Sequence, residues 1–406
     1  MLLVLHIIVL ITSIISLVST YSINFQKVVI NPFSYILFFG ILYLSIPSIV
    51  FLYSHTSSLI GAIDEDNLNY ISSVSLYTII IFLLGFIISF KLSFKVKEIN
   101  LNIGTGLKYA VLMAMIAIVA YVIMILIFNY DTLIEIYGNR RLQADFNTIL
   151  ISKYKVYFLF NILCIFILFL YFATKKYTYL IFLVPYFLID VILSSRYLIL
   201  EIIIFSLIVG AYHKKFLSIK TLFFMFLILV GFGLMRSTSI NNINLEDSLL
   251  EFLFTYSSSF LLIDSSYQSN ITDTLTHAIS KLNPYELLTN NTYVSYKVTM
   301  SELNPLKDRM GLGGSLITEI ISFKDLMIIG LIPIFISLYA FLINYFLRSN
   351  ILWLRIYGVL FILFIFNFFR GSMFEHLFYP FYLMVYFGFW VFMIDVINNN
   401  KMRRLR

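Results

Sequence analysis

The chain has 406 residues, of which 61% are hydrophobic and 12% are charged, and its formal net charge at pH 7 is +7. This composition leaves no room for a sizeable soluble domain, and the single cysteine, Cys164, excludes a disulfide framework and a thiolate metal cluster. The modest positive charge is ordinary for a membrane protein with cationic cytoplasmic loops, so it indicates no nucleic-acid partner.

Long apolar runs recur along the chain. A run of about 17–23 residues can cross about 30 Å of hydrocarbon as a helix. About eleven such runs are present, at residues 2–18, 33–53, 71–90, 107–128, 156–173, 177–193, 197–212, 220–235, 325–347, 351–368 and 377–396. The first run lacks the charged start and the cleavage site of a signal peptide, so we expect it to be retained as a span. The pattern predicts an all-α, polytopic bundle of transmembrane helices.

Lysine and arginine clusters orient the predicted bundle. They follow every second run: Lys91, Lys95 and Lys97; Lys175 and Lys176; Lys214, Lys215 and Lys220; Arg348 and Arg355; Lys401, Arg403, Arg404 and Arg406. With eleven spans all of these clusters lie on one face, which the positive-inside rule assigns to the cytoplasm. The C-terminus is then inside, and the active face of the protein is outside.

One segment of the chain is too long and too polar for a simple connection. Residues 236–324 form a predicted outer-face loop between eight spans in residues 1–235 and three spans plus a basic tail in residues 325–406. The loop carries two short amphipathic pieces, at 245–262 and 315–326. Both fit helices that lie at the membrane interface or dip back into the bundle.

Four arginines lie on the face that the other cations avoid: Arg196, Arg236, Arg309 and Arg370. An arginine at membrane depth is costly, and guanidinium forks match phosphate oxygens in bidentate pairs. We therefore predict a clamp for a pyrophosphate. The alternative is that each side chain snorkels towards headgroups or pairs with Asp190, Glu201, Glu319 or Glu375.

A glycine cluster follows Arg309. In the run Arg309-Met-Gly-Leu-Gly313-Gly314-Ser315, the glycines let backbone N–H groups approach an anion. A helix that starts near Ser315 would point its positive end at the same place. We therefore add Gly313, Gly314 and Ser315 to the predicted pyrophosphate site, with a plain glycine-rich turn as the alternative.

His376 is the best-placed candidate for a catalytic base. It shares a short outer-face turn with Arg370, and Glu375 beside it could orient its ring. The carboxylates of Asp190 and Glu201, inside or at the edge of spans, are the next candidates, although both are expected to pair with Arg196. The other histidines have no partners at metal-ligand spacing, so the sequence predicts no metal and no other cofactor.

Three of these stretches resemble the Wzy-type O-antigen and capsular polysaccharide polymerases, which join oligosaccharide repeat units. They are Ser194-Ser195-Arg196 in a mid-chain turn, Gly311-Leu-Gly-Gly-Ser315-Leu-Ile-Thr-Glu319 leading into a span, and Phe369-Arg370-Gly371 before the last span. The bundle with one long outer loop is also similar. O-antigen ligases share this architecture but use loop arginines and histidines, and the loop here has one histidine, His277.

The resemblance implies a glycosyltransferase of the bacterial inner membrane that acts at the outer face, in lipopolysaccharide or capsule synthesis. Its substrate would be an oligosaccharide on undecaprenyl pyrophosphate, and the lipid pyrophosphate would leave. Membrane lipids, a flippase and a chain-length regulator would be its partners. Three alternatives stay open: an O-antigen ligase, a flippase or other transporter of lipid-linked oligosaccharides, and a structural membrane subunit. Transporters often show internal repeats, and none stands out here.

Overall fold

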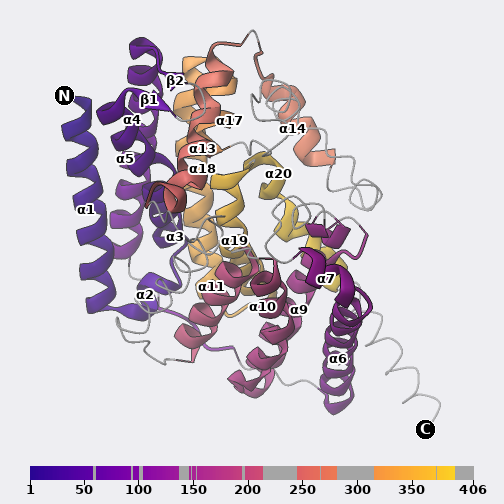
Figure 1. Cartoon of the computed structure of the whole chain (residues 1–406). Helices are drawn as coiled ribbons and strands as arrows, with labels where there is room; N and C mark the ends of the chain where they lie inside the picture. Colours follow the sequence, from indigo (N-terminus) through magenta and orange to yellow (C-terminus); the bar gives the residue numbers. More distant parts are fainter. Residues whose placement is uncertain are drawn as a thin grey trace. The chain divides into compact units, whose positions relative to one another are not determined.

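The computed structural model describes residues 1–57, 61–92, 95–99, 104–136, 146–147, 149–151, 153–193, 197–213, 245–265, 267–280, 315–371 and 373–388 (Figure 1). The chain divides into two compact units. Unit 1 comprises Met1–Lys95, Leu249–Arg348 and Phe361–Pro380. Unit 2 comprises Val96–Ser248, Ser349–Leu360 and Phe381–Arg406. Each unit is described by itself.

Seven described helices are long and apolar enough to cross a membrane. They are α1 (Leu2–Ile23), the segment Pro32–Ser54, α5 (Glu65–Lys91), α6 (Thr105–Phe128), α9 (Val156–Thr174), α18 (Leu326–Arg348) and α19 (Leu352–Arg370). Each of them contains most or all of one apolar run of the sequence. The chain is therefore a helical, membrane-embedded protein.

The remaining predicted spans differ in length or lie partly outside the described residues. The runs 177–193 and 197–212 form the shorter helices η2 (Tyr177–Leu183), α10 (Val184–Ile192) and α11 (Tyr197–Tyr212). The run 220–235 lies outside the described residues. The last run is described to residue 388 and is helical over 379–388.

Short polar sequences set the helix starts of unit 1. Before α3 (Pro32–Gly40), the Asn31 side chain accepts a hydrogen bond from the Phe33 N–H at 3.1 Å, and Pro32 occupies the first helical position. Proline is favoured there because the N–H it lacks would have no helical partner. Before α5, the Asp64 side chain accepts from the Asn67 N–H at 3.1 Å. These caps explain why both helices begin where they do.

The span Pro32–Ser54 is not a uniform α-helix. It runs through α3, the π-helical turn η1 (Ile41–Ser45) and α4 (Ile46–Ser54), where Pro47 lies in the first turn of α4. Pro47 has no N–H to donate, and a widened turn just before it accommodates that loss. The side chains of Phe33, Phe39 and Tyr43 on this span are buried.

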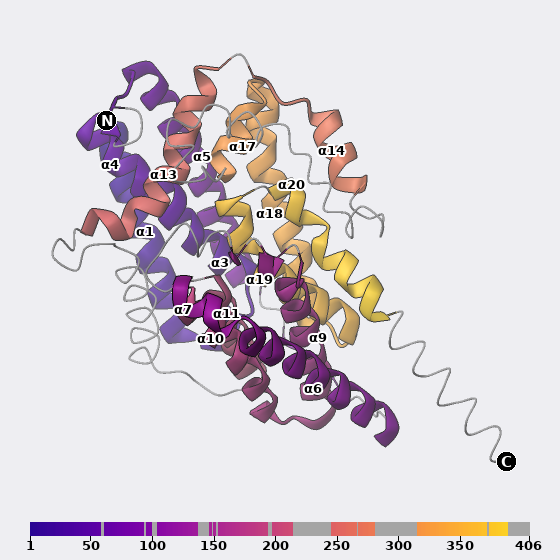
Figure 2. The same cartoon turned by 45° about the vertical axis from the view of Figure 1, so that its right-hand side comes forward.

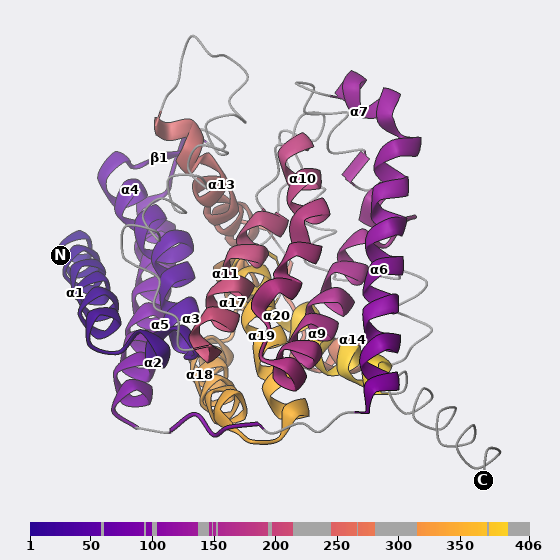
Figure 3. The same ribbon diagram turned by 90° about the horizontal axis from the view of Figure 1, so that it is seen from below.

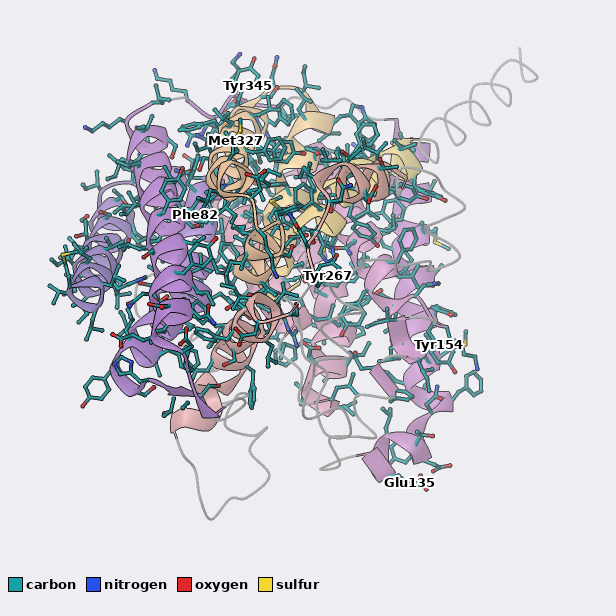
Figure 4. All side chains as sticks on the ribbon, turned by 90° about the horizontal axis from the view of Figure 1, so that it is seen from above. Phe82, Glu135, Tyr154, Tyr267, Met327 and Tyr345 are labelled. Carbon is teal, nitrogen blue, oxygen red and sulfur yellow. The ribbon has the colours of Figure 1, made fainter. Side chains whose placement is uncertain are left out.

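Close contact between α3 and α5 organises the core of unit 1. A Cβ on Gly85 of α5 would lie 2.2 Å from a ring carbon of Phe33, so only glycine allows this approach. Phe82, one turn earlier, is fully buried and contacts the Phe369 ring edge-on. Figure 4 labels Phe82 together with Met327 and Tyr345, which are exposed on α18. Exposed apolar side chains on this helix suit a lipid-facing surface.

Two helices of the predicted outer loop are buried in unit 1. In α13 (Leu245–Ile263), Tyr256, Ser257, Ser258 and Ser259 have no exposed surface, and α17 (Leu316–Ser322) is buried along its whole length. Figure 2 shows α17 beside α5, and the Tyr256 hydroxyl of α13 lies 3.1 Å from the Ser75 hydroxyl of α5. Of the two expectations for the amphipathic pieces, the described residues favour helices that dip back into the bundle. The short helices α2 (Phe25–Val29), α14 (Ile271–Ser280) and α20 (Met373–Leu377) and the hairpin of β1 (Thr56–Ser57) and β2 (Gly61–Ala62) complete this unit.

Unit 2 is built from α6, α7 (Tyr130–Ile136), α9, η2, α10 and α11, with the first part of α19 and the helical residues 381–388. Figure 3 shows α6, α9 and α10 beside one another. Phe166 and Phe169 of α9 pack on Phe387, at 5.4 and 5.7 Å between ring centroids. Phe160 of the same helix packs on Tyr186 of α10. Aromatic contacts therefore help to hold these helices of unit 2 together.

Labelling at Thr276 tests the predicted orientation. Thr276 is exposed on α14, whereas Ser257 is fully buried. In a Cys164→Ser background we expect Thr276→Cys to react with an impermeant maleimide on intact cells, because the cationic clusters then lie inside. Ser257→Cys should stay unreactive on either side. Reaction of Thr276→Cys only after the membrane is opened would reverse the topology.

Candidate functional site

A buried carboxylate ties α17 to the turn after α19. Glu319 is 2% exposed, and its Oε2 accepts a hydrogen bond from the Met373 N–H at 2.6 Å. Met373 begins α20, the helix that carries His376. A short bond from a backbone N–H to a carboxylate is a strong, charge-assisted one. Glu319 therefore holds this turn in place from inside unit 1.

Hydroxyl groups fix α17 itself. Ser315 is its N-cap and accepts from the Thr318 N–H at 3.3 Å, so the predicted helix start at Ser315 is confirmed. The Thr318 hydroxyl lies 2.8 Å from that of Ser315 and 2.7 Å from that of Ser258 on α13. All three side chains are buried. Because these hydroxyls satisfy one another, Ser315 acts as a structural cap rather than as an open ligand.

The same buried seam continues along α13. The Tyr256 hydroxyl lies 2.7 Å from the Ser48 hydroxyl and 3.1 Å from that of Ser75. The Ser57 and Ser257 hydroxyls are 2.9 Å apart. These bonds join α13 to the spans Pro32–Ser54 and α5 and to strand β1. A polar helix is thereby held in an otherwise apolar unit.

Arg370 and His376 lie on either side of the turn that Glu319 holds. Arg370 ends α19, is partly exposed, and places its guanidinium 5.8 Å from the centre of the Phe366 ring. His376 is partly exposed, and its ring lies parallel to that of Phe364 at 6.2 Å. The Nε2 of His376 lies 3.8 Å from the place that a Cβ on Gly371 would occupy. A cation and a titratable ring thus share one short turn.

Several predicted site residues belong to other parts of the chain than those described. Arg196, Arg236, Arg309, Gly313 and Gly314 lie outside the described residues, and so does the Glu375 side chain, although its backbone belongs to α20. Convergence of Arg196 and Arg370 on one cavity therefore stays a prediction.

The two alternative bases belong to unit 2. Asp190 at the end of α10 is fully buried, and its Oδ2 accepts from the Ile199 N–H at 2.8 Å. Ile199 lies in the first turn of α11, so Asp190 satisfies a backbone donor that a helix start leaves open. Glu201 on α11 is also fully buried. These positions suit carboxylates that hold the α10–α11 hairpin, whereas partly exposed His376 can meet a substrate.

The arrangement supports two chemical tasks. The Arg370 guanidinium can bind an anionic oxygen, and the His376 imidazole can accept a proton near neutral pH. The sequence pattern offered Glu319 as a partner for an arginine, but it could not indicate the backbone N–H 54 positions away to which the carboxylate is bonded. The one sequence signal is a carboxylate inside the apolar stretch Leu316-Ile-Thr-Glu319-Ile-Ile. Among the described residues, no three His, Cys, Asp or Glu side chains are grouped to hold a metal ion.

Replacing Glu319 tests its positioning role. Glu319→Ala leaves the buried Met373 N–H without an acceptor, so we expect a loss of about 1–3 kcal/mol in stability. Glu319→Gln keeps an acceptor oxygen and should lose less. Glu65→Ala, at an exposed acid in the first turn of α5, is the matched control. Thermal unfolding of each purified variant in detergent measures its loss of stability. Equal losses in all three variants would contradict the proposed role of Glu319 in holding the turn.

Comparison of the chain with protein-family models, with curated proteins and with solved structures found no match.

Proposed function

We propose that this chain is a membrane-embedded polysaccharide polymerase. It joins oligosaccharide repeat units carried on undecaprenyl pyrophosphate, at the outer face of a bacterial inner membrane. The sequence resemblance suggests the reaction. The observation that carries the proposal furthest is the bond from the Met373 N–H to buried Glu319, because it fixes the turn that bears Arg370 and His376. A preorganised cation beside a base is what transfer from a pyrophosphate requires.

Two residues of this turn, Arg370 and His376, have roles in the proposed transfer reaction. The hydroxyl oxygen of one repeat unit attacks the anomeric carbon of the growing glycan. The bond from that carbon to the pyrophosphate oxygen breaks, and its electron pair leaves with the lipid pyrophosphate. Arg370 binds the negative charge that develops on the leaving oxygens. His376 takes the proton of the attacking hydroxyl late in the step.

The predicted outer segments of unit 1 lie together, which supports an outer-face site. Asn67 donates to Asp264 at 2.7 Å, and the Ser269 N–H donates to the Ser322 carbonyl at 2.7 Å. The Gln268 side chain donates to the Phe323 carbonyl at 3.0 Å. These bonds join the first turn of α5, the segment after α13 and the end of α17, all of which the charge pattern sorts to the outside.

An extension assay tests the proposal. Purified full-length protein in EDTA should lengthen lipid-linked repeat units, because the leaving group is already activated and the charged side chains supply the electrostatics. Gel separation of the labelled glycans measures the ladder. Loss of activity in EDTA, with rescue by a divalent cation, would show that extension requires a metal ion and would contradict the metal-independent mechanism.

The assay also separates the alternatives. Movement of the lipid-linked units across liposomes without extension would make the chain a transporter. Transfer of a whole glycan to a lipid A core acceptor, with no ladder, would make it a ligase.

A further inference from the structure

Arg355 is a buried cation at one end of unit 2. It lies in the first turn of α19, is 2% exposed, and donates through Nη2 to the carbonyl oxygens of Lys97 and Ser349. Its guanidinium lies 5.2 Å from the centre of the Phe172 ring and 5.0 Å from that of Tyr212. In the described part of the chain, Nε is buried without an acceptor. These partners are dipoles and ring faces rather than an anion.

A second cation lies on the same aromatic ring. Lys175 follows α9 in a left-handed conformation, and its Nζ lies 5.6 Å from the centre of the Phe172 ring. The same Nζ donates to the Ile99 carbonyl at 3.1 Å, and the side chain reaches solvent. Burial first, and then the charge of Arg355, lower the pKa of Lys175, while Glu98 opposes them. Lys175 and Arg355 thus place two like charges 5.6 and 5.2 Å from the centre of one ring.

The cation pair lies where several helix ends meet. Tyr212 and His213, at the end of α11, contact Phe172 and Tyr171, at the end of α9. Tyr177, which begins η2, also contacts His213. The charge pattern sorts all of these segments to the inner face, and their meeting at one end of unit 2 agrees with that sorting. Aromatic rings at helix ends are typical of the membrane interface.

We propose that Lys175 and Arg355 form a site for the phosphate of an anionic phospholipid in the inner leaflet. Lys175 contacts the phosphate oxygens directly, and Arg355, which lies against the same Phe172 ring, adds positive potential. An anion there offsets the repulsion between the two cations. The bound anion also stabilises the chain segment that contains Lys97 and Ile99. Arg355 donates to the Lys97 carbonyl of this segment, and Lys175 donates to the Ile99 carbonyl. The inner leaflet is rich in such lipids, whose headgroups attract basic residues close to the membrane surface.

Lipid retention by the full-length protein tests the site. Protein purified in a neutral detergent is mixed with phosphatidylglycerol or with phosphatidylcholine of the same acyl chains, and bound lipid is counted by native mass spectrometry. We expect preferential retention of phosphatidylglycerol and about 10-fold weaker retention in Lys175→Gln, which loses a charge-assisted bond. Lys176→Gln is the matched control, because Lys176 is adjacent and exposed and carries the same charge. It should retain the lipid as the wild type does.

A second readout does not depend on a charge-removing variant. Phosphatidylglycerol should slow acylation of the Lys175 amine relative to that of Lys176, because an adjacent anion favours the protonated form. Competition with millimolar inorganic phosphate distinguishes a site for a lipid headgroup phosphate from a site for free phosphate. Complete displacement of the lipid would make the site one for free phosphate and overturn the lipid assignment.

Two results of the lipid-retention experiment would overturn the proposed site. Equal losses in Lys175→Gln and Lys176→Gln would show diffuse surface charge rather than a site. Equal retention of the two lipids would have the same meaning. Arg355→Gln is assessed by the acylation readout after its thermal unfolding is compared with that of the wild type. If Arg355→Gln folds and phosphatidylglycerol protects Lys175 as fully as in the wild type, Arg355 does not contribute to lipid binding and only holds the segment that contains Lys97.

Discussion

Replacing His376 by alanine is expected to lower the turnover of repeat-unit extension by about 10²- to 10⁴-fold, the usual range for a general base. Substrate binding should change little, because the ring acts on a proton that moves in the transition state. The reason is structural as well as chemical. His376 is partly exposed on the turn held by Glu319, while Asp190 and Glu201 are fully buried. Steady-state extension rates over a range of substrate concentrations measure the split between kcat and KM.

His55→Asn is the matched control for this variant. His55 is also a histidine of unit 1 on the predicted outer face, and it ends α4 in a left-handed conformation that asparagine tolerates. Its turnover should equal that of the wild type. Unchanged turnover in His376→Ala, together with an inactive but folded Asp190→Asn or Glu201→Gln, would transfer the base to a carboxylate.

Replacing Arg370 by lysine is expected to lower extension by about 10- to 100-fold although the charge is kept. The planar guanidinium can grip two phosphate oxygens at once, and a lysine amine offers a point charge in place of that fork. Arg370 ends α19 on the predicted outer face, beside the turn that carries His376. We expect the same behaviour for Arg196→Lys if both side chains hold one pyrophosphate. Glycan length profiles from cells that make each variant measure the loss.

Arg348→Lys controls for the exchange itself. Arg348 ends α18 as Arg370 ends α19, but the charge pattern places it on the inner face. Its glycan profile should be that of the wild type at equal protein levels. Full-length polymer in both Arg370→Lys and Arg196→Lys would identify these arginines as snorkelling side chains.

The spans could be predicted because hydrophobic length is a local property. Every described long apolar helix coincides with an apolar run of the sequence, and local capping signals at Asn31-Pro32, Asp64 and Ser315 mark helix starts in the structure. The turn that carries two of the candidate site residues could also be predicted. His376 and Arg370 stand out because a polar turn interrupts apolar runs, and the structure places them on one turn.

The partner of each buried polar group could not be predicted in the same way. The bond from Met373 to Glu319 and the contact between Ser258 and Thr318 join residues 54 and 60 positions apart. Ser257, Ser258 and Ser259 of α13 are fully buried although each carries a polar hydroxyl. Arg355 belonged to an ordinary inner-face cluster in the sequence, and its burial between two rings follows from how α9, α11 and α19 pack.

The amino-acid sequence by itself indicated that the chain is a helical membrane protein and where its seven described long apolar helices lie, and it predicted which face collects the cations. Those properties depend on hydrophobic length and charge along a few dozen consecutive residues. Only the tertiary structure decided which carboxylate holds the α19–α20 turn, which cations share the Phe172 ring and which serines are buried. A polar group in an apolar interior needs a hydrogen-bond partner, and packing can bring that partner from any part of the chain. The residues next to the polar group in the sequence therefore do not indicate which partner it will have.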